Sequence, residues 1–260
     1  MGSSVSASIE RHRREDRFFF AYAILLLVIV FVGFSPSLFL RVAFETPTIP
    51  FYLHLHGAIL TGWFIWLVAQ AWLVRSGNVS LHRRLGYFAA AYGPVVVAGG
   101  LMATFNAVSR DLGMGITFEI DMTEIDPALG SGISYLTFVS AVVWANIVSV
   151  STFAILIGAA VALRSRPDFH KRLILVGTVS ILAPALARIS RYEILGGEQG
   201  PFVDSALLSL LTAIVIYDLV TLRKIHKASL VAVCFAISLS ILGTMISQSD
   251  FGREFVRGLA

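Results

Sequence analysis

Charged residues and cysteine are both scarce in this chain of 260 residues. Only 14% of the residues are Asp, Glu, Lys or Arg, whereas a soluble domain carries about 25%. The single cysteine, Cys234, lies in an apolar stretch, which excludes an intramolecular disulfide and a cysteine-based metal site. The composition therefore excludes an ordinary soluble domain, and 57% of the residues are hydrophobic.

Sequence motifs of the common enzyme classes are also missing. There is no glycine-rich phosphate loop, no HExxH motif and no nucleophile elbow. The dense histidine boxes of membrane di-iron hydroxylases are absent as well. The sequence therefore assigns no enzymatic activity, and we expect no nucleic acid among its partners.

The hydrophobic residues fall in blocks of about twenty, the length that crosses a hydrocarbon layer of about 30 Å. Segments this long must be helical, because every backbone polar group has to be bonded within its segment. We predict an all-α, polytopic membrane helical bundle of seven spans, with a basic N-terminal tail at 1–17, the transmembrane domain at 18–247 and a C-terminal tail at 248–260. The predicted spans are 18–40, 53–74, 85–108, 133–163, 173–190, 203–222 and 228–247.

Positive charge is distributed unevenly among the predicted loops. With a cytoplasmic N-terminus, fourteen of the twenty Lys and Arg residues lie on the inner side, many of them in the short loops 75–84, 164–172 and 223–227. Short loops are where the positive-inside rule applies, and the outer segment 117–126 is acidic. The sequence predicts a bacterial cytoplasmic membrane protein with its C-terminus outside. The pI near 9.5 follows largely from this topology.

One motif occurs twice, as SLHRRLG at residues 80–86 and DFHKRLI at residues 168–174. Each copy places a histidine and two cations at the start of an outward-running span, and a proline follows at Pro94 or Pro184. Spans two and three, and spans four and five, are therefore predicted to be two helical hairpins related by duplication.

His82 and His170 from these motifs are candidate cofactor ligands. Two histidines on different helices can bind a haem iron axially, or they can relay protons. Asp218 is predicted within the hydrocarbon or at its edge, where a carboxylate is costly and indicates a function or a specific partner. The alternative is that the basic turns only anchor the helices, and that Asp218 pairs with Arg172 or Arg223.

His54 and His56, near the outer end of the second span, are candidate metal ligands. Residues two apart point in different directions on a helix but to the same side of an extended segment. If the helix began only at Gly57, His54 and His56 would lie in an extended segment and could bind the same ion. The alternative is that they are interfacial anchors. Outer carboxylates would complete a site for zinc, iron or copper; these are Glu119, Asp121, Glu124, Asp126 and Asp204.

Arg188 and Arg191 suggest a polar pocket at the outer side. They are three residues apart and would share a face of the fifth span, with Asn106 at a similar depth. An anionic headgroup, a carboxylate or a quinone oxygen would suit them, and the alternative is that they snorkel to the headgroups. Gln70, deeper in the second span, is interpreted as a hydrogen-bonding contact between helices, with a ligand contact as the alternative.

The motifs HLHG, LHRRLG and FHKRLI resemble those of a group of small bacterial multi-span membrane proteins known only as a domain of unknown function. The resemblance covers spans two to five, about half of the chain. The His-Lys-Arg-Leu element is similar to one in small membrane proteins that assist cytochrome oxidase assembly. The layout also resembles two-haem transmembrane cytochromes b, which implies axial ligation by His82 and His170, although the regular pairs of mid-helix histidines of those cytochromes are missing.

We therefore expect an integral membrane protein of haem, quinone or respiratory-chain biology, acting in electron transfer or assembly. The sequence leaves the cofactor open; haem b and a transition metal are the candidates, with Asp218 supporting the two motif histidines. The expected partners are the lipid bilayer and a quinone or another membrane protein. One alternative is a small-molecule carrier or sensor with a polar pocket between helices kinked at Pro94 and Pro184. The other is a membrane scaffold with no site of its own.

Overall fold

The computed structural model describes residues 2–46, 48–125, 132–192 and 199–260. Within these ranges the chain forms helices and no β-strand, apart from one isolated bridge between Asp121 and Ser134. The predicted all-α fold is therefore confirmed. The elements are α1 (Gly2–Phe34), the π-helical turn η1 (Ser35–Phe39), α2 (Phe51–Arg75), α3 (Val79–Gly113), the 3-10 turn η2 (Met122–Glu124), α4 (Tyr135–Ala162), α5 (Pro167–Ser180), α6 (Ala183–Ile189), α7 (Gln199–Leu222), α8 (Lys227–Gln248) and α9 (Asp250–Arg257).

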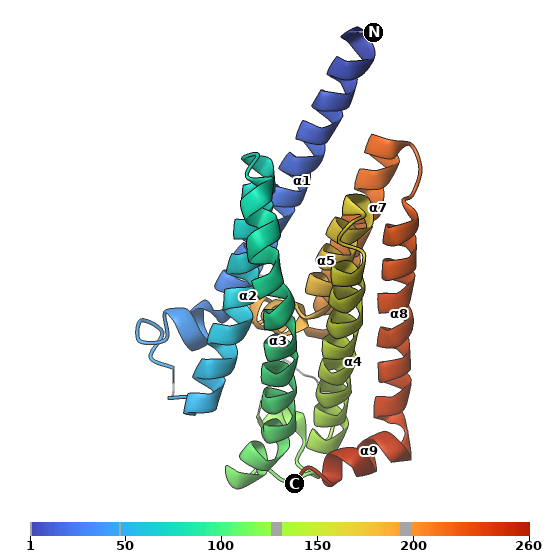
Figure 1. The fold of residues 1–260 in the computed structure, drawn as a ribbon. Helices are drawn as coiled ribbons and strands as arrows, with labels where there is room; N and C mark the ends of the chain where they lie inside the picture. Colours follow the sequence, from blue (N-terminus) through green and yellow to red (C-terminus); the bar gives the residue numbers. More distant parts are fainter. Residues whose placement is uncertain (1, 47, 126–131, 193–198) are drawn as a thin grey trace.

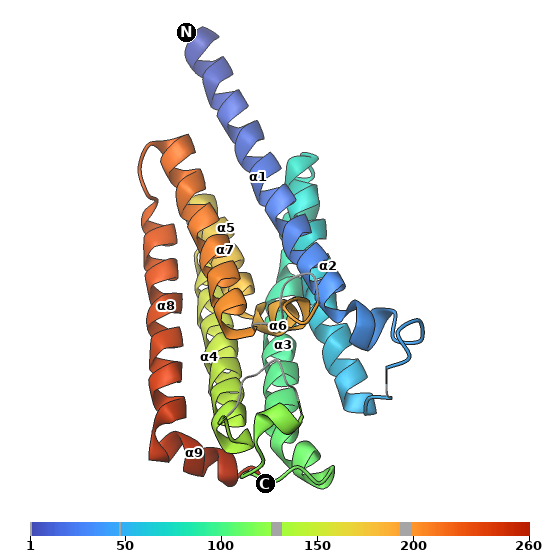
Figure 2. The same cartoon turned by 180° about the vertical axis from the view of Figure 1, so that it is seen from behind.

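The long helices lie side by side in an elongated bundle, with the two chain ends at opposite ends of it (Figures 1 and 2). Six of them are long and apolar enough to cross a membrane, and the bent pair α5–α6 makes seven if it is one span. Large apolar side chains cover the outer helix faces. Val220, Val231 and Met245, for example, are 71%, 65% and 66% exposed, as expected of surfaces that contact lipid rather than water.

The fifth predicted span, residues 173–190, is not a continuous helix. α5 ends at Ser180, α6 begins at Ala183, and the two helices are bent by 50° at the break. Pro184 lies in the first turn of α6, where its missing N–H leaves no helical hydrogen bond unmade. α3, in contrast, continues through Pro94. The two hairpins therefore differ at their prolines, and only the second is broken.

α6 lies across the bundle, about halfway along its length (Figures 1 and 2), where it packs against α1. Gly33 permits this contact, because a Cβ atom at this position would collide with the backbone of Ala185. Beyond α6, the Tyr192 hydroxyl donates a hydrogen bond to the Val32 carbonyl at 2.9 Å. The bend after α5 is thus fixed by its fit to the end of α1.

The main hydrophobic core joins α1, α2, α4, α5 and α7. Trp63 of α2 is central to it, with its ring edge against Phe153 of α4 at 4.9 Å between centroids. The Trp63 indole donates a hydrogen bond to the Thr178 hydroxyl of α5 at 3.1 Å. Leu26 of α1 and Ile214 of α7 are fully buried in the same cluster. This core brings the two predicted hairpins, α2–α3 and α4–α5, into contact.

A second cluster closes the end of the bundle at which α9 lies. Residues 248–260, predicted only as a tail, contain α9, which packs against α4 and α8. Val256 of α9 is fully buried with Val108 of α3 and Val143 of α4. The Trp144 indole donates a hydrogen bond to the Gly252 carbonyl at 3.1 Å.

Candidate functional site

The two motif histidines meet at one end of the bundle. His82 is the fourth residue of α3 and His170 is the fourth residue of α5, so each has the same place in its hairpin. Their ring centroids are 6.3 Å apart, with the ring planes at 81°. The structure thus brings together the two residues that the repeated motif singles out.

Backbone carbonyls of the preceding helices lie beside both rings. His170 Nδ1 is 2.8 Å from the Ala160 carbonyl of α4. The Gln70 carbonyl of α2 lies near the His82 ring, but His82 Nδ1 has no hydrogen-bond partner in the described part of the chain. An Nδ1–H group that points at a carbonyl leaves Nε2 available as a ligand nitrogen. Each hairpin therefore offers one imidazole at this end of the bundle, and that of His170 is oriented by the helix before it.

Two polar side chains of α2 are buried without a hydrogen-bond partner in the described part of the chain. Gln70 is 9% exposed, and neither atom of its amide is bonded. The Trp66 indole nitrogen, one turn earlier on α2, is also unbonded, while its ring lies against Phe88 of α3. Such groups cost about 1–3 kcal/mol each when left unsatisfied. A polar ligand here would complete the site, and the interpretation of Gln70 as a hydrogen-bonding contact between helices is not supported.

Cations surround this end of the bundle. The guanidinium of Arg164, in the turn after α4, lies 6.0 Å from the ring centroid of Tyr87 of α3, so the basic turn of one hairpin adjoins the other hairpin. This part of the molecule therefore suits a ligand that carries negative charge. The other arginines of these turns are Arg75, Arg83, Arg84 and Arg166.

Asp218 belongs to a separate buried network, although it was predicted to support the two histidines. Arg172 donates from Nε and Nη2 to Asp218 Oδ1 at 3.0 and 2.5 Å. The other carboxylate oxygen accepts hydrogen bonds from the Ser229 hydroxyl at 2.5 Å and the His226 backbone N–H at 3.2 Å. Arg172 and Asp218 are both 0% exposed. Asp218 is therefore paired with Arg172, which was the alternative interpretation of the sequence. A buried carboxylate needs an opposite charge beside it.

The neighbouring cation of the second motif binds α1. Lys171 Nζ lies 3.0 Å from the Glu15 carboxylate, which is almost fully buried. The Phe19 ring lies beside Lys171 and Arg172, at 4.9 and 5.8 Å from its centroid. The two cations of DFHKRLI therefore hold α1 and α7 to α5, whereas the two cations of SLHRRLG are exposed. The histidine has the same position in both copies, whereas the two cations of the motif have different surroundings.

His226 lies at the same end of the bundle, where it caps α8. Its Nδ1 accepts a hydrogen bond from the Ala228 N–H at 3.1 Å, and its ring contacts Phe169 edge-on. Burial lowers the pKa of His226 below the usual 6.5; the charge of Arg172 lowers it further, and that of Asp218 opposes the shift. The neutral ring is the form that caps the helix.

The predicted outer metal site is not formed. α2 begins at Phe51, so His54 and His56 are both helical and point in different directions. His56 Nδ1 lies 2.9 Å from the Gly99 carbonyl of α3. Among the residues that the structure describes, which exclude Asp126, no group of three or more His, Cys, Asp and Glu side chains could hold a metal ion.

Arg188 lies on α6, and the break before α6 changes its surroundings. Its Nη1 donates a hydrogen bond to the Pro184 carbonyl at 2.9 Å, and its guanidinium lies 4.4 Å from the ring centroid of Phe34. Arg191 follows the end of α6. The two arginines would share a helix face only if the fifth span were continuous, and the structure does not place them on one face.

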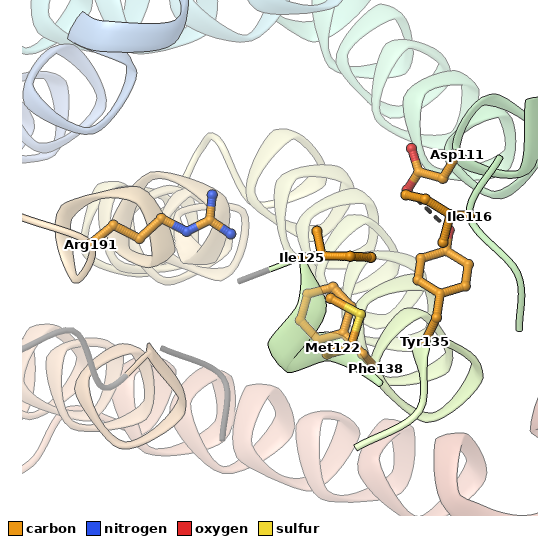
Figure 3. A pocket seen from close by; sticks show the side chains of 7 residues that line it. All are labelled: Asp111, Ile116, Met122, Ile125, Tyr135, Phe138 and Arg191. Atoms are coloured by element: carbon orange, nitrogen blue, oxygen red, sulfur yellow. Dashed lines mark hydrogen bonds between the residues drawn. The ribbon is translucent and has the colours of Figure 1, made fainter. Parts of the chain in front are cut away.

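The remaining predicted pocket residues lie apart from one another. Asn106 donates a hydrogen bond to the Met102 carbonyl of its own helix, and Gln70 lies near His82 at the other end of the bundle. Arg191 does line a cavity of about 230 Å³, which is shown in Figure 3. The other lining residues are Asp111, Ile116, Met122, Ile125, Tyr135 and Phe138.

Asp111 is the acidic residue of this cavity. Its Oδ1 accepts hydrogen bonds from Arg110 Nε and Nη2 at 2.8 and 2.6 Å, and its Oδ2 accepts one from the Tyr135 hydroxyl at 3.0 Å. Sequence reasoning missed Asp111 and Tyr135, which are 24 residues apart. The only local signal was the charged pair Arg110–Asp111 beyond the third span.

Comparison with known proteins identifies no relative of this chain. No family model, no curated protein and no solved structure matches the chain. In the part of the chain that the structure describes, two arrangements have polar groups placed to receive a ligand: the histidine pair with Gln70, and the cavity between Asp111 and Arg191.

Proposed function

We propose that His82 and His170 are the two protein ligands of a haem iron, and that the chain is a haem-binding membrane protein of electron transfer. The observation that carries this proposal is the meeting of two imidazoles, one from each hairpin, at 6.3 Å between ring centroids. With metal–nitrogen bonds of about 2 Å, two imidazoles on opposite sides of one ion have their centroids about 6 Å apart. The spacing therefore suits one ion between the two rings.

The small number of ligands favours haem over a bare metal ion. In the described ranges no third His, Cys, Asp or Glu joins the two histidines to form a metal-binding group, whereas a protein zinc site usually has three or four protein ligands. A porphyrin supplies four nitrogens of its own, so two axial residues complete the coordination of the iron.

The neighbouring residues suit the polar edge of a haem. The unbonded amide of Gln70, whose backbone carbonyl lies near His82, is a donor available to its propionates, and the arginines of the adjoining turns would offset their charge. When bound between His82 and His170, haem would supply one-electron chemistry. A quinone or another membrane protein is the class of redox partner that this role requires.

An absorption spectrum of the purified protein tests the proposal. After haem-replete expression, we expect a Soret band and the sharp visible bands of a low-spin haem upon reduction. His82→Ala and His170→Ala should each lose the low-spin bands, because either change removes one axial ligand.

His54→Ala is the matched control, because His54 is an exposed histidine of α2 and should leave the spectrum unchanged. Absence of a Soret band in the unmodified protein would contradict haem binding. Low-spin bands that survive in both ligand variants would contradict the assignment of the ligands.

A further inference from the structure

The cavity between Asp111 and Arg191 has no part in the proposed haem site. It is formed where α3 ends and α4 begins, at the end of the bundle opposite the histidine pair (Figures 1 and 3). Asp111 and the guanidinium of Arg191 lie on opposite sides of it, with apolar side chains between them (Figure 3). The cavity therefore has an acceptor end at Asp111, whose carboxylate is paired with Arg110, a cationic end at Arg191, and an apolar middle.

Asp111 provides the acceptor end. Two hydrogen bonds from Arg110 and one from Tyr135 fix its carboxylate in place. A carboxylate offers about four lone pairs, so Asp111 can accept a further hydrogen bond after these three. A hydroxyl group of a ligand is the neutral donor that this position suits.

Arg191 provides the donor end. It also interacts within the protein, but a guanidinium carries five N–H donors, so it can bind an additional acceptor. Its planar fork matches the two oxygens of a carboxylate better than a single carbonyl oxygen. An anionic, planar acceptor is therefore the preferred group at this end.

The walls between the two ends suit a flat apolar ring. Phe138 and Tyr135 contribute aromatic side chains, and Met122 contributes a thioether, which packs favourably against ring edges. Ile116 and Ile125 complete the apolar lining. A volume of about 230 Å³ suits a molecule with one ring rather than a large cofactor.

We propose that this cavity is a binding site for a small aromatic hydroxy-carboxylate. The carboxylate binds Arg191, the ring lies between Phe138 and the isoleucines, and the hydroxyl donates a hydrogen bond to Asp111. This site is independent of the proposed haem, since it uses none of the residues near His82 and His170.

Calorimetric titration of the full chain in detergent with three probes tests the chemistry of the ligand. We expect 4-hydroxybenzoate to bind at least about tenfold more tightly than benzoate, which lacks the hydroxyl, or hydroquinone, which lacks the carboxylate, since loss of a hydrogen bond to a charged group has about this effect. Equal binding of the three probes, no binding of any, or tightest binding of hydroquinone would overturn the proposal.

Variants test the two ends of the cavity. Arg191→Gln should weaken 4-hydroxybenzoate binding at least about tenfold, and Asp111→Asn should reduce the preference for 4-hydroxybenzoate over benzoate. The control is Arg257→Gln, because Arg257 is an exposed arginine of α9 that is paired with Glu254. This variant should bind 4-hydroxybenzoate as tightly as the unmodified protein does.

The same titration of His82→Ala separates this site from the haem. We expect unchanged affinity for 4-hydroxybenzoate in that variant. Unchanged affinity in Arg191→Gln would instead show that the ligand does not bind at this cavity.

Discussion

At the scale of single residues, His226 links helix capping to pH. Its Nδ1 accepts the hydrogen bond of the Ala228 N–H, and only an unprotonated nitrogen can accept. Burial and the charge of Arg172 hold its pKa below the usual 6.5. Folding therefore disfavours protonation of His226. Its contribution to stability is complete above about pH 6.5, the pKa of the unfolded chain, and is lost as the pH falls toward and through the lower pKa of the folded state.

The variant His226→Asn should remove this pH dependence, because asparagine caps a helix without titrating. We expect the Tm of the unmodified protein to fall relative to that of the variant as the pH is lowered from about 7.5 to 5. Thermal unfolding of both proteins in the same detergent measures the difference. The comparison of the two proteins cancels the effects of the other histidines, which both proteins contain. If the Tm of both proteins changed with pH in parallel, the assigned role of His226 would be contradicted.

Some residues of the candidate sites could be predicted from the sequence and others could not. The pairing of His82 with His170 was predictable because a repeated motif gives both residues the same place in a hairpin. Asp111 and Tyr135 could not be paired, since the sequence does not indicate how the end of α3 packs against the start of α4. Asp218 could be recognised as costly in the membrane, but its partner depends on how α7 packs against α5.

At the scale of elements, one buried ion pair joins α5, α7 and α8. Arg172 of α5 binds Asp218 of α7, and Asp218 binds Ser229 of α8. Removal of one partner of a buried pair leaves an uncompensated charge and costs about 3–5 kcal/mol. The three helices therefore depend on both members being present.

Asp218→Leu and Arg172→Met should each lower the free energy of unfolding by about this amount, 3–5 kcal/mol. The double variant Arg172→Met/Asp218→Leu should be more stable than either single variant, because it leaves no unpaired charge. Unfolding in mixed detergent micelles measures these differences. Arg257→Gln, which breaks an exposed pair, is the control and should change stability by less than about 1 kcal/mol. Additive losses in the double variant would contradict a coupled pair.

The places of most spans could be predicted because blocks of about twenty hydrophobic residues mark them, although α1 and α3 extend beyond the predicted spans. The break of the fifth span could not, since residues 173–190 are apolar on both sides of it. A proline is not sufficient as a signal, because α3 continues through Pro94 and the chain breaks before Pro184. What differs is the contact of α6 with Gly33 of α1, which is a property of the packed bundle.

At the scale of the whole molecule, the basic turns before α3, before α5 and between α7 and α8 share one end of the bundle (Figure 1). The histidine pair lies at this end. Because short basic loops stay in the cytoplasm, we propose that this end faces the cytoplasm and that the cavity lined by Arg191 opens to the outside.

Reporter fusions test this orientation. Alkaline phosphatase fused after Ala260 should be active, because it folds only outside the cytoplasm. The same enzyme fused after Lys224, in the turn between α7 and α8, should be inactive. Green fluorescent protein at the same positions is the reciprocal control. The opposite pattern would place the histidine pair on the outer face.

The position of α9 has a consequence for the order of biosynthesis. α9 completes the cluster around Val108 and Val143, but it follows α8 and so leaves the ribosome after both α3 and α4. Until α8 has been inserted, this end of the nascent protein exposes apolar surface that its own chain cannot cover. Assembly of the bundle therefore finishes at the end that holds α9, after the histidine-bearing turns have been made.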